Sequence, residues 1–284
     1  MIKKDIADTI QDAIDKMPPL PIVIDKVIRI ANDPKSSAQD MVDVIQLDPV
    51  LTSRILQLIN SAYFGLNFEL HSLKQSIMAL GFNTIKSVAF STAILNKVSL
   101  KKTNVINPDE FWKHSFGVGV TSKMIAELSG VNKRYSEDFF VAGLIHDIGE
   151  ILFYNAFPDE CVKVGEMVVK KKLPLPEIER EVLGFSHEDI GLTIGKKWNF
   201  EPYFLYAVGK HHYPVMEGPH SKYSMIVSAA NYMANVAGLS LFNEGFFATL
   251  PDNIWQEIGV DYSKVAESMP NVESEIEKAR ILLR

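Results

Sequence analysis

Apolar residues recur at intervals of three and four along nearly the whole chain, which is the pattern of amphipathic helices. The spacing predicts a first helix over residues 4–17 and a second over 22–32, with three prolines between them that end the first. Further on, Asp48 and Pro49 supply an N-cap and a first helical residue for another helix. Essentially no stretch alternates with the period of two that a half-buried strand needs. The sequence therefore predicts an all-α fold.

A short polar run divides the chain into two predicted lobes. Residues 101–104 lack helical periodicity, so we place an N-terminal helical lobe over 1–103 and a second lobe over 104–284, the latter with a C-terminal helical extension. The second lobe opens with Asn-Pro-Asp-Glu from Asn107, a pattern typical of a helix start. The long helix that follows is expected to run to Leu128.

The most apolar helical segment is FFVAGLIHDIGEILFYN, residues 139–155, which only His146, Asp147 and Glu150 interrupt. Because too many of its faces are apolar for a surface helix, we expect it to run through the core. Burying an unpaired imidazole or carboxylate costs several kcal/mol, so these polar side chains need partners. The chain offers four more histidines on or beside predicted helices: His114, His187, His211 and His212.

Two interpretations of these residues are open. The histidines and Asp147 can converge on a metal ion, or each histidine can be satisfied by hydrogen bonds within the core. Ser186 and Asp189 form a predicted capping box that places His187 at a helix N-terminus, where the pKa of an imidazole is lowered toward the neutral form that a metal needs. Glu110 lies four residues before His114 on the same helix face, and is either an accessory ligand or a capping carboxylate.

Composition narrows the environment and the partners. The chain is 47% hydrophobic, which is enough for a core that needs no disulfide cross-links. Its single cysteine, Cys161, excludes an intramolecular disulfide. The single cysteine and the lack of an apolar signal region after Met1 together predict a cytoplasmic protein. No apolar run reaches the roughly 20 residues that cross a bilayer. A net charge of -6 argues against nucleic acid as a partner. No glycine-rich phosphate loop follows a strand, so we expect no organic cofactor.

Two parts of the chain, one around DVIQLDPVLTSRILQLINSAYFG and one around GLIHDIGE, resemble the HDOD family, the HD-related output domains of bacterial signalling proteins. The first part matches the N-terminal helices of that family in order, through LPIVIDKVIRIANDP, DVIQLDPVLTSRILQLINSAYFG and SLKQSIMALGFNTIKSVAF. The second resembles the family's degenerate form of the HD phosphohydrolase core, through FWKHS, GLIHDIGE, LGFSHEDIGLTIGKKWNF and HHYP. The resemblance covers roughly residues 18–215 and implies an N-terminal helical lobe packed on an HD-like helical lobe.

HD phosphohydrolases and the related HD-GYP phosphodiesterases hold metals with a lone histidine, a His-Asp doublet, later histidines and a final aspartate. The resemblance therefore implies six ligands in this chain: His114, His146, Asp147, His187, His211 and His212. The final aspartate is replaced by Asn231, an amide that coordinates weakly and brings no charge. Glu150 stands where HD-GYP enzymes have a lysine, and its charge is expected to repel a substrate phosphate. The Gly-Tyr-Pro loop is missing.

These departures favour a regulatory signal-transduction module that is catalytically inactive, and we assign no catalytic residue. The resemblance implies that such a module acts through contacts with other signalling proteins and can bind a divalent transition metal, namely iron, zinc, nickel or manganese. One alternative is a metal-dependent phosphohydrolase or phosphodiesterase that acts on nucleotides or cyclic dinucleotides. Another is a cyclic dinucleotide receptor that binds without hydrolysis.

Overall fold

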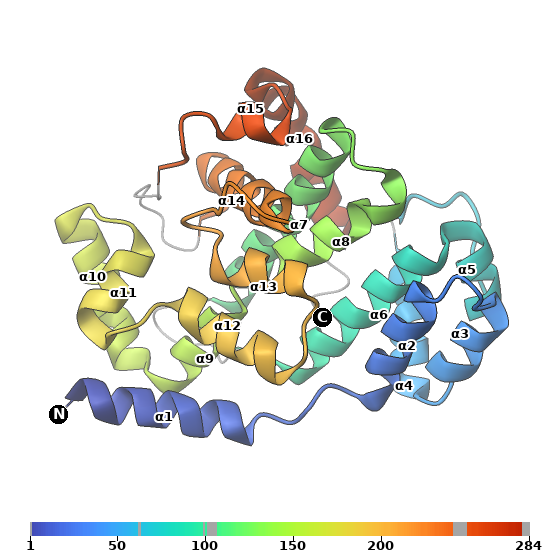
Figure 1. The fold of residues 1–284 in the computed structure, drawn as a ribbon, viewed down its shortest axis with the longest axis horizontal. Helices are drawn as coiled ribbons and strands as arrows, with labels where there is room; N and C mark the ends of the chain where they lie inside the picture. Colours follow the sequence, from blue (N-terminus) through green and yellow to red (C-terminus); the bar gives the residue numbers. More distant parts are fainter. Residues whose placement is uncertain (1, 62–63, 99, 101–106, 241–248, 280–284) are drawn as a thin grey trace.

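The computed structural model describes residues 2–61, 64–98, 100, 107–240 and 249–279, and within these ranges the chain forms helices and no strand (Figure 1). The predicted all-α fold is confirmed. The helices are α1 (Ile2–Lys16), α2 (Ile22–Asn32), α3 (Ala38–Ile45), α4 (Pro49–Ile59), α5 (Leu73–Leu80), α6 (Phe82–Lys97), α7 (Pro108–Leu128), α8 (Lys133–Ile145), α9 (Ile148–Ala156), α10 (Pro158–Lys171), α11 (Leu175–Leu183), α12 (His187–Lys197), α13 (Pro202–Gly209), α14 (Ser221–Val236), α15 (Ile254–Ile258) and α16 (Tyr262–Ala279).

Helices α2 to α6 pack on one another at one end of the molecule, on the right in Figure 1. Local sequence fixes several of their ends. The carboxylate of Asp48 accepts a hydrogen bond from the main-chain N–H of Leu51 (3.0 Å) in front of Pro49, as the sequence predicts for the start of α4. Gly81 joins α5 to α6 with φ of +84°, a conformation that favours glycine.

The remaining helices are organised around α7, which packs against α8, α14 and α16, while α9 packs against α12 and α12 against α13. Helices α10 and α11 form a pair at the left edge of Figure 1. Contact between α7 and α8 is close because of glycine: a Cβ on Gly143 of α8 would lie 2.7 Å from the carbonyl oxygen of Val118 in α7. This close approach positions the end of α8, where the His-Asp doublet begins.

The first helix packs with the second group rather than with α2 to α6. It lies along α9, α11 and α12 (Figure 1), and the ammonium of Lys197 donates to the carbonyl oxygens of Ile14 (2.5 Å) and Asp15 (2.7 Å) at its C-terminus. The indole N–H of Trp198 donates to the carbonyl of Pro18 (3.1 Å), which anchors the proline-rich link as it leaves. The predicted lobe boundary near residue 103 lies outside the described residues.

A buried ion pair joins the two groups of helices where α6 packs on α8. The ammonium of Lys86 lies 3.0 Å from the carboxylate of Asp138, and the hydroxyl of Ser87 donates to the same carboxylate (3.2 Å). Breaking a buried pair by removing one partner costs about 3–5 kcal/mol, because the other charge is left without compensation. The pair therefore fixes how α6 sits against the second lobe.

The apolar segment of residues 139–155 is buried almost throughout, as expected, but it is not one helix. Helix α8 ends at Ile145 and α9 begins at Ile148, with the His-Asp doublet between them. Successive side chains of an unbroken helix point about 100° apart and do not face each other. The interruption allows His146 and Asp147 to reach the same point in the core.

None of the helices in the described part of the chain has the length and apolar content that a membrane span requires.

Candidate metal centre

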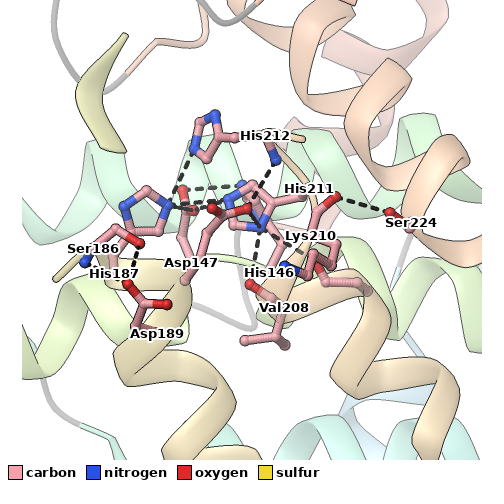
Figure 2. A network of polar contacts seen from close by, with 12 residues as sticks. His146, Asp147, Ser186, His187, Asp189, Val208, Lys210, His211, His212 and Ser224 are labelled. Carbon is pink, nitrogen blue, oxygen red and sulfur yellow. Dashed lines mark hydrogen bonds and ion pairs between the residues drawn. The ribbon is translucent and has the colours of Figure 1, made fainter. Parts of the chain in front are cut away.

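A buried carboxylate, that of Asp147, lies at the centre of five histidine side chains, four of which are labelled in Figure 2. Asp147 is 5% exposed, and four of the histidines are 3% exposed or less, whereas His212 is half-buried. The histidines come from separate elements: His114 from α7, His146 from the break between α8 and α9, His187 from the first position of α12, and His211 and His212 from the loop after α13. All six residues that the resemblance implies as ligands therefore meet in one place.

One oxygen of Asp147 faces the first half of the cluster. Its Oδ2 lies 3.0 Å from Nε2 of His146 and 3.4 Å from Nε2 of His114. The two Nε2 atoms are 3.3 Å apart. This half thus offers two imidazole nitrogens and one carboxylate oxygen to a shared point.

The other oxygen faces the second half. Oδ1 of Asp147 lies 3.2 Å from Nε2 of His211 and 3.6 Å from Nε2 of His187. Nε2 of His187 is in turn 3.1 Å from Nε2 of both His211 and His212. Asp147 therefore bridges a group of two imidazoles and a group of three, an arrangement that suits one ion or two.

The outward nitrogens show which ring atoms carry protons. Nδ1 of His114 lies 2.7 Å from the carbonyl oxygen of Leu239, and Nδ1 of His146 lies 2.7 Å from that of Gly143. Nδ1 of His211 lies 3.1 Å from the carbonyl oxygen of Val208. A carbonyl oxygen can only accept, so Nδ1 donates and Nε2 is left with an inward lone pair. Ligating histidines in metal sites are oriented in the same way.

Lone pairs that face one another at about 3 Å repel unless a cation lies between them. Oδ1 of Asp147 is buried as well and receives no hydrogen bond from the described residues. Both observations fit a divalent ion, which would accept the lone pairs and balance the buried negative charge. The core-histidine alternative explains the outward nitrogens but leaves the inward nitrogens of His114 and His146 facing each other at 3.3 Å with no proton between them.

The loop that carries His211 and His212 is held from two sides. The hydroxyl of Ser224 in α14 donates to the carbonyl of Lys210 (2.8 Å, Figure 2) and accepts from the N–H of Val215 (3.0 Å). The carboxylate of Glu188 accepts from the main-chain N–H of His212 (3.1 Å) and is itself paired with Arg180 (3.3 Å). The two histidines are therefore positioned by main-chain contacts on both sides of the loop.

Two buried carboxylates behind His187 complete the centre. Oε2 of Glu179 in α11 lies 2.7 Å from Nδ1 of His187 and accepts its main-chain N–H (3.0 Å), and Oε1 of Glu150 lies 3.3 Å from the same Nδ1. The expected role of Glu150 in repelling a phosphate requires that it face a space for substrate. Its side chain is instead fully buried on the outer side of the His187 ring. Glu179 was not predicted, because its place in the charged run of α11 looks like that of any helix-surface glutamate.

The charges in the cluster follow from burial and from close neighbours. Burial lowers the pKa of His146 to about 4, although the adjacent Asp147 opposes this. For Asp147 burial alone would raise the pKa, but His146, His114 and His211 together hold it well below its usual range. Asp147 is therefore ionised and His146 neutral at neutral pH, which are the states that bind a metal.

The expected lowering of the His187 pKa is wrong. Burial does favour the neutral ring, but Glu179 and Glu150 outweigh it and raise the pKa of His187 well above its ordinary value. In the metal-free protein this ring takes up a proton, which a bound ion has to displace. Burial and the neighbouring Glu179 likewise raise the pKa of Glu150 well above its usual range.

The two accessory candidates, Asn231 and Glu110, differ in their burial and in their contacts. Asn231 is a buried residue of α14, and its amide oxygen accepts a hydrogen bond from Nδ2 of Asn235 (2.9 Å), so that oxygen is already engaged within the helix. Glu110 is exposed in the first turn of α7 and belongs to none of the potential ligand groups that the described residues form. The structure does not bring Glu110 into the centre.

The fold and the centre together define an all-helical protein built around an HD-type cluster of histidines and one aspartate. Comparison with a model of the HDOD domain gives a match over residues 17–214, well over half of the chain. The chain belongs to the HDOD family. The resemblance seen in the sequence is thereby confirmed.

Similar proteins of known sequence or structure agree with this assignment. An uncharacterised protein of Treponema pallidum (strain Nichols) is 23% identical over 210 residues, which are 73% of this chain but only 40% of that protein. The structure of a candidate phosphohydrolase from Shewanella amazonensis SB2B matches with a TM-score of 0.74 at 22% identity, over 97% of this chain and 98% of that one. A candidate signal transduction protein from Marinobacter aquaeolei VT8 matches with a TM-score of 0.77 at 18% identity, over 100% of this chain and 66% of that one. At these identities the structural likeness shows the fold alone.

The close approach of α9 and α12 gives a test of the centre's geometry. A Cβ on Gly149 would lie 2.0 Å from the carbonyl oxygen of His187 and 2.7 Å from the N–H nitrogen of Gly191. Both atoms are main chain, so Gly149→Ala has to push α12 and His187 away from Asp147. We expect a stability loss of roughly 1–3 kcal/mol in urea unfolding and a clear fall in metal content by elemental analysis. Gly218→Ala, in an open loop with φ of +107°, is the control: a loss of stability there without loss of metal is expected, and equal metal loss in both variants would contradict the geometry.

Proposed function

We propose that this HDOD protein is a regulatory module that holds a transition-metal ion in a closed centre and acts through contacts with other signalling proteins, without turnover. The observation that carries the proposal is the burial of the ligand atoms: only His212 among the six candidate ligands is more than 5% exposed. Catalytic metal sites keep an open position for water or substrate, whereas structural sites are closed by protein ligands. The closed centre supports a binding role.

The two halves of the centre differ in what they offer an ion. The Oδ1 side has three imidazoles, while the Oδ2 side has two, and the chain carries Asn231 in place of the final aspartate that the family resemblance implies. Two divalent ions bring about +4, of which Asp147 offsets one unit. We therefore infer one tightly held ion on the Oδ1 side, drawn from iron, zinc, nickel and manganese, the ions that imidazole and carboxylate ligands suit. When bound, such an ion supplies Lewis acidity, and the protein's own residues hold it away from solvent.

Elemental analysis of protein purified without added metal tests this proposal. We expect at most one tightly held equivalent per chain, and a higher stoichiometry in Asn231→Asp after metal is supplied, because the new carboxylate offsets a second unit of charge. His211→Ala and Asp147→Ala should remove the tight ion. The matched control is His71→Ala, which changes an exposed histidine of the N-terminal lobe and should leave the metal content unchanged.

Unchanged metal in Asp147→Ala would show that the site assignment is wrong. The same preparations, supplied with each metal, should not hydrolyse nucleotide phosphates or cyclic dinucleotides. Turnover of about 1 per second or faster, which is ordinary for enzymes, would replace the regulatory proposal with the phosphohydrolase alternative. Tight binding of a cyclic dinucleotide without hydrolysis would support the receptor alternative.

Exposed apolar side chains on the N-terminal lobe support the proposal of protein partners. Phe68 and Met78 are 61% and 76% exposed, and they line one hollow together with Leu70 and Gln75. Large apolar side chains gathered on a surface commonly mark a site of protein contact. The described residues of the N-terminal lobe also contribute no ligand to the candidate metal centre, so their surface is free to serve recognition.

Surface substitutions test this contact without disturbing the core. Deleting residues 1–100 would also remove α1 and α6, which pack on the second lobe, so we choose Phe68→Ser combined with Met78→Glu. We expect this variant to keep its metal and stability but to lose a signalling partner that the unchanged protein retains on affinity purification from native cells. Val162→Ser, at an exposed aliphatic position of α10, is the control. Full partner retention by the double variant would exclude this surface.

A further inference from the structure

Glu179 is a buried carboxylate whose described hydrogen bonds all go to a single residue, His187. Its Oε2 accepts the main-chain N–H of His187 (3.0 Å) and lies 2.7 Å from Nδ1 of the ring. Its Oε1 is buried and has no hydrogen-bond partner among the described residues. The side chain therefore ties α11 to one ring of the metal centre and makes no hydrogen bond to another element of the described structure.

His187 differs in this respect from the three other histidines whose outer nitrogen has a partner in the core. The outer nitrogens (Nδ1) of His114, His146 and His211 face neutral main-chain carbonyl oxygens. The outer nitrogen of His187 faces the carboxylate of Glu179 at 2.7 Å, and a carboxyl oxygen of Glu150 lies 3.3 Å from the same nitrogen. An anionic acceptor makes a stronger hydrogen bond than a neutral one and increases the basicity of the opposite ring nitrogen.

We propose that Glu179 is a positioning residue of the metal centre, which holds the Nδ1–H of His187 so that Nε2 presents its lone pair beside Asp147, His211 and His212. This inference rests on the proposed metal-binding function and extends it. It explains why the half with three imidazoles keeps its ion: its central ring is both oriented and made a better donor by the carboxylate behind it.

A purely structural role for Glu179 fits the contacts less well. An amide oxygen could accept the same two N–H groups, and burying an amide costs far less than burying a carboxylate. Glu179 is 0% exposed and has no cationic side chain from Lys or Arg paired with it in the described structure. In the described structure the charge of Glu179 is therefore balanced only through His187, by the protonated ring in the metal-free protein and by a ring that binds a cation on its far side in the metal-bound protein.

Glu179→Gln tests the role of the charge, since glutamine keeps the shape and an acceptor oxygen. In the full chain, competition with a chromophoric chelator should give a zinc affinity about 10–100-fold weaker than that of the unchanged protein. Thermal unfolding should show a folded variant. Glu181→Gln is the matched control: it removes a charge from the same helix at an exposed position that pairs with Lys171 (2.5 Å), and its zinc affinity should be unchanged.

A spectroscopic signature separates positioning from general stabilisation. In the cobalt-loaded protein, proton NMR should show the exchangeable Nδ1–H of His187 as a strongly shifted signal, because the ring binds the ion through Nε2. Glu179→Gln should move this signal or lose it through faster exchange, and Glu181→Gln should not. A variant that merely weakened the fold would leave the signal in place in its folded fraction.

The outcomes distinguish this inference from the proposed function. If Glu179→Gln binds zinc as tightly as the unchanged protein and keeps the same cobalt spectrum, Glu179 has no positioning role, while the metal centre itself stands. If the unchanged protein takes up neither zinc nor cobalt, the proposed function fails and this inference fails with it. Should Glu179→Gln not fold, Glu179→Asp keeps the charge but withdraws it from Nδ1 by one methylene, and an undiminished zinc affinity there would also overturn the role.

Discussion

The structure depends on one costly interaction, the burial of an ionised carboxylate among imidazoles whose lone pairs point inward. An isolated carboxylate in a protein core is strongly disfavoured, and Asp147 is 5% exposed with one oxygen that receives no hydrogen bond from the described residues. Three of the imidazoles around it, those of His114, His146 and His211, use their outer nitrogens on main-chain carbonyls, so their inner nitrogens cannot donate to it in the neutral ring. A cation resolves both problems at once, which is why we interpret the cluster as a metal centre.

Much of the second lobe can be understood as the framework that this cluster requires. The break between α8 and α9 lets adjacent residues of the His-Asp doublet face the same point, and glycines allow α7 to approach α8 and α9 to approach α12. The ligands on the Oδ1 side come from the break between α8 and α9, from α12 and from the loop after α13, so a bound ion is expected to hold these three parts together. The N-terminal lobe is attached to this framework by α6 and by the ion pair of Lys86 with Asp138.

The sequence predicts the parts that depend on local patterns. The helices, the cap at Asp48 and the start of α7 follow from periodicity and capping chemistry, and the six candidate ligands follow from the family resemblance. What it does not predict depends on distant contacts. Nothing local indicates that Glu179 meets His187, that its charge reverses the expected pKa change of that ring, or that α1 packs on the second lobe. The interruption of the 139–155 segment is hidden because apolar periodicity continues through it.

The central claim is that an ion lies between Oδ1 of Asp147 and the three imidazoles of His187, His211 and His212. Anomalous X-ray diffraction from crystals of the metal-loaded protein, measured at the absorption edge of the metal, tests it most directly. The account predicts a single strong anomalous peak about 2.0–2.2 Å from Oδ1 of Asp147 and from the Nε2 atoms of these histidines. An absence of anomalous density there, with a metal-loaded crystal showing its peak at surface residues instead, would contradict the account.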